Sequence, residues 1–288
     1  MADPKDTDEI TGVDTTGHDW DGIKELNNPL PRWWLWCFYL TIIWGVGYAI
    51  AYPAWPMLSG ATRGVLGFST RANVAADIDM FRQANAVVAT QLAAADLTAL
   101  TPGTPVHNYA IAGGASVFRS NCSQCHGSGA SGAKGYPNLL DDDWLWGGSV
   151  EDIEASVKHG IRNSTDEDAH WSQMPAFGDI LEPEEITAAA NFVLSLSDKP
   201  HDATLATVGM EIFADNCSSC HGDKGEGMRD QGAPNLTDNI TLYGDDLDTL
   251  METITQARFG VMPAWGQRLS EADVKAVALY VHQLGGGE

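Results

Sequence analysis

The hydrophobic pattern of the chain contains one long apolar run, at residues 33–52. Its twenty residues carry no charge, and as a helix they would span about 30 Å, the thickness of the hydrocarbon core of a bilayer. Aromatic residues gather at both ends, where a membrane helix meets the two interfaces: Trp33, Trp34, Trp36, Tyr52 and Trp55. We therefore predict a single transmembrane helix over 33–52.

A cleaved signal peptide is the main alternative for this run. The 32 residues ahead of it are acidic rather than basic, the run is longer than the apolar core of a signal, and no A-x-A site follows. Three basic residues lie before the run and three within thirty residues after it, so the positive-inside rule gives no orientation. The run is interpreted as an anchor, with Cys37 as one of its small apolar side chains.

Beyond the run, apolar residues recur at helical spacing, and few strands are expected. The expected helices are 69–100 (one or two helices), 113–118, 149–159, 183–196, 207–213, 247–257 and 270–284. The pattern indicates a mainly α fold class with one N-terminal transmembrane helix.

The second half of the chain repeats itself. Residues 118–127 match 213–222, residues 137–139 match 234–236, and residues 174–178 match 262–266, in the same order and between 88 and 97 positions apart. We therefore divide the chain into a segment 1–32, the helix 33–52, a spacer 53–106, and two domains, 107–200 and 201–288.

Each repeat contains the motif Cys-x-x-Cys-His, the attachment signal of c-type haem. Two cysteines three residues apart on a helical turn point to the same side, so both sulfurs can bond one haem while the histidine ligates its iron. A thioredoxin-like or zinc site is opposed by the adjacent histidine and by the lack of a second ligand pair in either repeat. Two covalently bound haem c groups are predicted, held by Cys122, Cys125 and His126, and by Cys217, Cys220 and His221. The expected fold is therefore mainly α, with one N-terminal transmembrane helix followed by two tandem class I-like cytochrome c domains.

A sixth iron ligand is expected downstream of each motif. Among the eight methionines, Met174 and Met262 alone occupy equivalent positions, each before a proline that keeps the backbone extended. A His/Met pair raises the haem potential. His159 and His170 could compete as ligands, although neither has a counterpart in the second repeat.

The charge of the chain limits the kinds of partner it can bind. The 288 residues include 16 basic and 39 acidic side chains, a formal net charge of −23, which excludes a basic nucleic-acid-binding surface. Each repeat holds 5 basic and 14 acidic groups. Such surfaces either steer a basic cytochrome or simply keep the domains soluble.

Orientation follows from the haem motifs rather than from the flanking charge. Because haem is attached to Cys-x-x-Cys-His outside the cytoplasm, we expect the N-terminal 32 residues in the cytoplasm and both haem domains in the bacterial periplasm. The protein is then a single-pass protein of the inner membrane.

The combination of motifs resembles subunit III of cbb3-type cytochrome c oxidases, the CcoP/FixP family. The likeness rests on the anchor followed by two haem motifs, and on residues 16–34, 136–148, 260–266 and the Gly-Gly-Gly-Glu ending. Residues 239–244 depart from the family, because they lack an expected tryptophan and a second glycine.

The resemblance implies an electron-transfer subunit that is not an enzyme on its own. It implies a soluble cytochrome c as donor, and a mono-haem cytochrome subunit and a haem–copper catalytic subunit as partners in reducing oxygen. His126 and His221 carry over as proximal ligands and Met174 and Met262 as distal ones. Pairing within each domain is simplest by sequence, whereas the resemblance favours crossed pairing, with Met262 on the first haem, and the sequence leaves both open.

Two other functions share part of this evidence. A free-standing, membrane-anchored dihaem shuttle shares every haem argument and differs only in having no oxidase partner. A dihaem peroxidase would need an open iron position, which two equivalent methionines oppose, and a haem-based sensor would need an output domain that these residues do not contain.

Overall fold

The computed structural model describes residues 6–288. The chain divides into two compact units, residues 1–83 and 84–288, with the boundary inside helix α2 (Thr70–Ala93). Each unit is described by itself.

The first unit begins with a hairpin of β1 (Thr15–Trp20) and β2 (Ile23–Leu26). Asp21 and Gly22 connect the strands with φ of +57° and +87°, as a two-residue type I′ turn requires. The hairpin was not among the expected elements, although its Asp-Gly pair between alternating residues is a recognisable turn signal.

Helix α1 (Arg32–Ala51) follows and matches the predicted span to within one residue at each end. It begins after Pro31, which disfavours a helical backbone at Leu30, and it ends before Pro53, which does the same at Tyr52. None of its residues is buried, and within residues 6–288 it is the one helix long and apolar enough to cross a membrane. A short hairpin comes next, made of the two-residue strands β3 (Pro56–Met57) and β4 (Gly60–Ala61).

The second unit is helical, which confirms the mainly α class. Its α-helices are α3 (Pro105–Val117), α4 (Ser123–His126), α5 (Val150–His159), α6 (Pro183–Leu196), α7 (Ala203–Asn216), α8 (Ser218–His221), α9 (Leu247–Gln256) and α10 (Glu271–His282). Single turns lie between them: η1 (Leu97–Ala99), η2 (Phe118–Cys122), η3 (Phe177–Asp179), η4 (Arg229–Gln231) and η5 (Trp265–Gln267). Side-chain caps start α5 and α10, where Ser149 and Ser270 accept from the backbone N–H three residues on.

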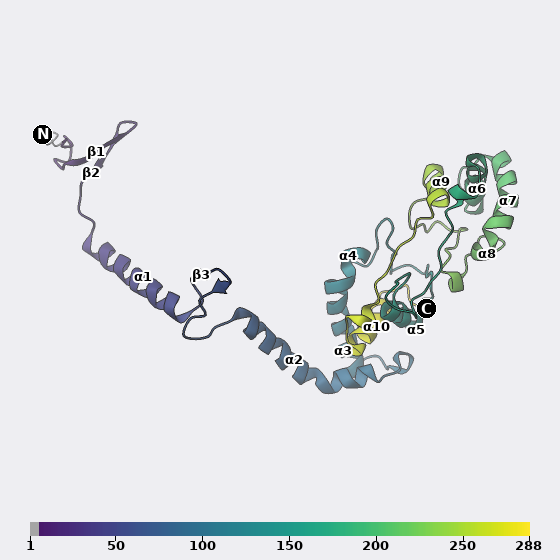
Figure 1. Ribbon diagram of the computed structural model, residues 1–288, viewed down its shortest axis with the longest axis horizontal. Helices are drawn as coiled ribbons and strands as arrows, with labels where there is room; N and C mark the ends of the chain where they lie inside the picture. Colours follow the sequence, from purple (N-terminus) through teal and green to yellow (C-terminus); the bar gives the residue numbers. More distant parts are fainter. Residues whose placement is uncertain (1–5) are drawn as a thin grey trace. The chain divides into compact units, whose positions relative to one another are not determined.

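The closing helices pack against the opposite repeat. Helix α10 lies beside α3, and α6 lies beside α7 (Figure 1). Glycines permit both close approaches, because a Cβ at Gly114 would overlap the carbonyl of Ala276, and one at Gly209 would overlap that of Ala188. The two contacts are equivalent in the repeats, so the exchange is symmetric.

Two hydrophobic cores result. One joins α3, α5 and α10 through Ala110, Ile153 and Val277, and it includes Phe118 of η2. The other joins α6 and α9 through Ile186 and Ile254, and α7 packs on α6. Each core therefore combines helices from both repeats, and each sits next to one cysteine motif.

Candidate haem sites

The first motif lies at the junction of η2 and the short helix α4. Cys122 ends η2, and Cys125 and His126 lie on α4. The imidazole Nδ1 of His126 donates to the carbonyl of Pro137 at 3.1 Å. This bond fixes the ring and leaves Nε2 as the ligand atom. Burial lowers the pKa of His126, so the imidazole is neutral, as ligation to a metal requires.

The second motif reproduces this geometry. His221 ends α8, and its Nδ1 donates to the carbonyl of Pro234, also at 3.1 Å. Burial lowers the pKa of His221 as well. Gly127 and Gly222 terminate the two short helices with the same φ of +79°, a conformation that glycine adopts without strain.

The motif cysteines lack the properties of a redox pair. No disulfide is present among residues 6–288. Burial raises the pKa of Cys122 and of Cys217 to about 11, whereas the reactive cysteine of a thioredoxin-like motif has a lowered pKa. The chemistry of these side chains thus fits thioether attachment rather than thiol–disulfide exchange.

Met262 lies with the first motif, although it belongs to the second repeat. Its backbone exchanges two hydrogen bonds with Ile161, at 2.9 and 3.0 Å, and Gly160 leaves room for this approach because a Cβ there would overlap the carbonyl of Met262. Met262 and Cys122 pack against the same core, around Phe118. We call Cys122, Cys125, His126 and Met262 the first site.

Met174 lies with the second motif. It packs on the core that contains Phe177 and Ile254. It also lines a cavity of about 660 Å³ together with Cys217, Cys220 and His221, a volume in the usual range of cofactor pockets. We call Cys217, Cys220, His221 and Met174 the second site. The structure thus places Met174 in one cavity with the second motif and Met262 on the same core as Cys122 of the first motif.

The competing histidines occupy other positions. His159 bonds to Asp166 through Nδ1, at 3.1 Å. His170 stacks on Trp146, with ring centroids 4.7 Å apart. Both the Nε2 of His170 and the Nε1 of Trp146 are buried and have no partner within residues 6–288. Burial lowers the pKa of His170, so it is neutral.

The second repeat has a different stack in the position equivalent to Trp146. The guanidinium of Arg258 lies over the ring of Tyr243, 4.7 Å from its centroid. Both residues line the 660 Å³ cavity, and so does Arg162. Burial lowers the pKa of Arg162, and this guanidinium has no carboxylate partner in the described part of the chain, bonding instead to the carbonyls of Ser172 and Gly260. The contacts of these three side chains could not be predicted from the sequence, since they join segments far apart in the chain.

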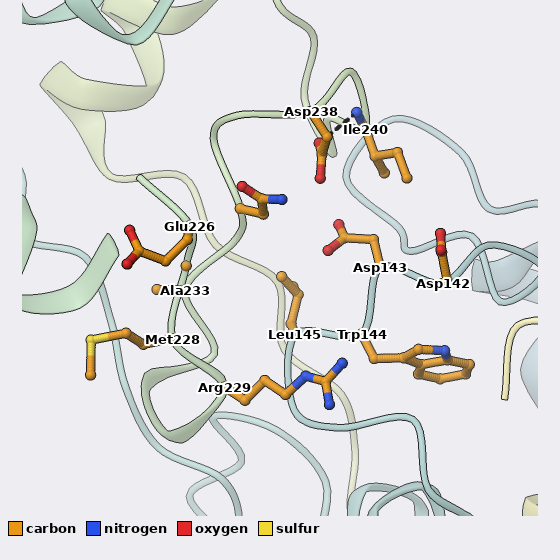
Figure 2. A pocket seen from close by; sticks show the side chains of 12 residues that line it. Asp142, Asp143, Trp144, Leu145, Glu226, Met228, Arg229, Ala233, Asp238 and Ile240 are labelled. Atoms are coloured by element: carbon orange, nitrogen blue, oxygen red, sulfur yellow. Dashed lines mark hydrogen bonds between the residues drawn. The ribbon is translucent and has the colours of Figure 1, made fainter. Parts of the chain in front are cut away.

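A second, polar cavity of about 360 Å³ separates the loops of the two repeats (Figure 2). Burial, followed by the charge of Asp238, raises the pKa of Asp143 to about 6. The equivalent residue of the second repeat, Ile240, lines the same cavity. Arg229, also in this cavity, forms an ion pair with Glu288, and the backbone N–H of Glu288 donates to Gly148. The C-terminal residues are thereby tied to both repeats.

Two family models match the chain. The N-terminal domain of cytochrome oxidase-cbb3, FixP, matches residues 12–59. Cytochrome C oxidase, cbb3-type, subunit III, matches twice, at residues 110–193 and 204–281. The two matches to the latter coincide with the two repeats.

Curated relatives cover almost the whole chain. A cbb3-type cytochrome c oxidase subunit CcoP from Cereibacter sphaeroides is 58% identical over 95% of this chain and 95% of its own length. A subunit CcoP from Rhodobacter capsulatus is 53% identical over 96% and 97%. A subunit FixP from Sinorhizobium medicae is 50% identical over the full length of both chains.

Proposed function

The chain belongs to the family of subunit III of cbb3-type cytochrome c oxidases, and from that premise we propose that it is the electron-input subunit of such an oxidase. It receives electrons from a soluble cytochrome c and delivers them to a mono-haem cytochrome subunit and a haem–copper catalytic subunit. The subunit transfers electrons and does not itself reduce oxygen. The observation that carries this proposal is the twofold presence of a complete set of cysteines, anchored histidine and methionine.

Two haem c groups are assigned to these sets. The first is held by Cys122, Cys125 and His126, with Met262 as the distal ligand. The second is held by Cys217, Cys220 and His221, with Met174 as the distal ligand. This crossed assignment is supported by the cores on which the two methionines pack. In this assignment each haem takes its histidine from one repeat and its methionine from the other, because the repeats 107–200 and 201–288 exchange their closing helices.

The residues present fit this cofactor. The second site opens into a cavity of about 660 Å³. Each motif histidine is bonded through Nδ1, which leaves Nε2 for the iron. Two buried nitrogens, Nε2 of His170 beside Ile161 and Nε1 of Trp146 beside Gly232, have no partner within residues 6–288. Haem c, when bound, supplies a one-electron iron couple whose potential a His/Met pair raises.

The chain's own residues account for holding that couple in place. The carbonyls of Pro137 and Pro234 orient the two imidazoles and strengthen them as ligands. The buried rings of Phe118 and Phe213 exclude water from the face beside each motif. Rigid support of this kind keeps the reorganisation on electron transfer small, because neither ligand has to move.

The orientation in the membrane completes the proposal. Helix α1 anchors the chain in the bacterial inner membrane as a single span, residues 1–32 lie in the cytoplasm, and both sites lie in the periplasm, where c-type haem is attached and where a soluble cytochrome can reach them. The apolar and exposed surface of α1 supports the anchoring.

The test is to solubilise membranes gently, purify the tagged chain, and record its haem spectrum, copper content and oxygen uptake. Co-purification of b-type haem, copper and cytochrome c-dependent oxygen uptake is the expected result. Recovery of c-type haem alone, with no copper and no partner chain, would replace the proposal with the free-standing shuttle. Binding of carbon monoxide by the isolated reduced chain would favour a peroxidase instead.

A further inference from the structure

The segment between α1 and α2, residues 53–68, is nearly as free of charge as α1 itself. Arg63 is its one charged side chain, and it contains no carboxylate. Its six large apolar side chains are all exposed, by between 40% and 111%: Trp55, Met57, Leu58, Val65, Leu66 and Phe68. Exposed apolar side chains are usually scattered singly, so this concentration indicates a surface that something else covers. We call residues 53–68 the return segment.

The return segment folds back onto the C-terminal end of α1 (Figure 1). The backbone N–H of Val65 donates to the carbonyl of Ile50 at 2.9 Å, and that of Leu66 donates to Ala51 at 3.1 Å. The last carbonyls of a helix otherwise have no partner within it. Gly64 permits this contact, because its φ is +70° and a Cβ there would overlap the carbonyl of Ala51. The segment is therefore joined to the end of the apolar helix.

The return segment also satisfies much of its own backbone. Strand β3 pairs with β4, and the N–H of Thr62 donates to the carbonyl of Trp55 at 2.9 Å. The hydroxyl of Thr62 accepts from the N–H groups of Trp55 and Ala54, at 3.1 and 3.4 Å. Peptide groups bonded in this way can leave bulk water without the cost of an unpaired group in lipid. An isolated two-stranded hairpin is only marginally stable in water, so a supporting surface favours it.

The length of α1 determines the depth of the return segment. The 20 residues of α1 already span about 30 Å, so a segment bonded to its last turn lies at the headgroup interface. Tyr52 stacks on Tyr48 with ring centroids 4.7 Å apart, and Phe68 meets Tyr52 edge-on at 5.4 Å. Aromatic side chains concentrate at this depth. Arg63 is exposed, and a basic side chain there can reach lipid phosphates.

We propose that the return segment is a second membrane contact, whose six apolar side chains lie at the boundary between headgroups and acyl chains where α1 ends. Lipid is the occupant of this surface, because the segment is continuous with the membrane span. It also carries one basic residue and no acidic one, as anionic headgroups favour. The inference rests on the proposed function only in that α1 spans the membrane, and it presumes nothing about haem.

The consequence is that α2 starts at the membrane surface. Ser69 directly follows the return segment, and its hydroxyl accepts from the backbone N–H of Ala72 at 3.2 Å in the first turn of α2. Charged residues return at once, with Arg71, Asp77 and Asp79, where the chain leaves the lipid. Interfacial anchors set the tilt and rotation of a membrane helix, so the return segment restricts both for α1.

The test places spin labels on the full holo-chain in nanodiscs of phosphatidylcholine and phosphatidylglycerol. A Cys37→Ala background leaves only the introduced cysteine to react. Leu58→Cys places the label in the return segment, Ile43→Cys places it within α1, and Val208→Cys places it at an exposed apolar position of α7. Electron paramagnetic resonance then measures collisions with oxygen, which concentrates in lipid, and with a water-soluble nickel complex.

We expect the label at Leu58 to collide with the nickel complex at least about threefold less often than the label at Val208, because water is scarce below the headgroups. Its collisions with oxygen should be more frequent. Nickel accessibility equal to that at Val208, with the Ile43 label in lipid, would overturn this inference alone. An Ile43 label in water would overturn the membrane span of the proposed function as well.

The assembled oxidase distinguishes lipid from a neighbouring subunit. In the complex, the label at Leu58 should still collide with oxygen, and a fluorophore at the same position should be quenched by brominated lipid. Few collisions with either reagent, and no quenching, would mean that a protein surface covers the return segment, and the proposal would be wrong.

Gly64→Ala tests the contact with α1. The new Cβ would overlap the carbonyl of Ala51, so the return segment should detach and the nickel accessibility at Leu58 should rise toward that at Val208. Gly67→Ala is the control, because Gly67 has a similar φ of +60° but nothing within 4 Å of its Cβ position. An accessibility that Gly64→Ala leaves unchanged, or that both variants raise equally, would overturn the attachment of the segment to α1.

Discussion

The two candidate haem sites share the residues proposed to hold iron and differ in the residues around them. Both histidines bond to a proline carbonyl at 3.1 Å, and both short helices end in a glycine with φ of +79°. The ring equivalent to Trp146 is Tyr243, and the stacked group is the imidazole of His170 in the first repeat and the guanidinium of Arg258 in the second. Duplication has preserved the ligand scaffold, while substitutions and one insertion have changed the local charge.

The largest expected effect comes from removing one attachment motif. Replacing Cys122 and Cys125 by serine should halve the covalent haem per chain, because each motif attaches its haem through its own sulfurs. The same replacement of Cys217 and Cys220 should give an equal loss. Haem content per chain, measured as the pyridine haemochrome, checks both, and complete loss from either variant would mean that the sites are not independent in attachment.

The crossed assignment of the methionines predicts which site responds to a change of distal ligand. Met262→His should convert the haem of His126 from His/Met to bis-His ligation and lower its potential. Magnetic circular dichroism of the ferric chain should then retain one His/Met signal. Adding His221→Ala should abolish that signal, whereas adding His126→Ala should leave it intact; the reverse result would establish pairing within each repeat.

The exchange of closing helices can be tested at the α3–α10 contact. Gly114→Ala should reduce the free energy of unfolding by about 1–3 kcal/mol through overpacking, since the new Cβ would overlap the carbonyl of Ala276. Gly113→Ala is the matched control, because its Cβ would lie 3.9 Å from the Cβ of Ala276, an ordinary contact. Thermal unfolding of both variants measures the difference, and equal stability would contradict the packing.

The smallest expected effect concerns Asp143, whose equivalent is Ile240. A folded-state pKa of about 6, above the ordinary 3.8, means that the folded chain binds this proton more tightly than the unfolded chain. Stability therefore falls as the pH rises from about 4 to about 6 and stays lower above that.

Asp143→Asn should remove this loss and stabilise the chain at pH 7 by about 1 kcal/mol, a value reduced for the partial exposure of the carboxyl. No gain should remain below pH 4. Chemical denaturation at several pH values measures the effect, with the exposed Glu167→Gln as control, because Glu167 is not among the charges that act on Asp143. A stabilisation that does not vary with pH would contradict the assigned pKa.

Much of the fold and site follows from local sequence. The Cys-x-x-Cys-His motifs, the equivalent Met-Pro pairs and the apolar run of α1 each carry their own signal. The choice between Met174 and Met262 as the ligand opposite a given histidine does not, because the two repeats share one fold and offer equivalent surfaces to both closing helices. The decision depends on close contacts such as that of Gly160 with Met262, which involve residues far apart in the chain.

Other features lay outside the patterns considered. The hairpin before α1 was signalled by Asp21 and Gly22 and went unpredicted. The stacking of His170 on Trp146 could not be foreseen, since it joins two loops that no local pattern links.

The exchange of helices also imposes an order on biosynthesis. The first cysteine motif leaves the ribosome well before α10, yet its core is incomplete until α10 has been made and has packed against α3. Until then the motif remains an accessible, unfolded segment on which the attachment apparatus can act. Truncation of the chain before residue 271 would therefore remove α10, the helix that completes the core beside the first motif. The α6–α7 contact beside the second motif would stay intact.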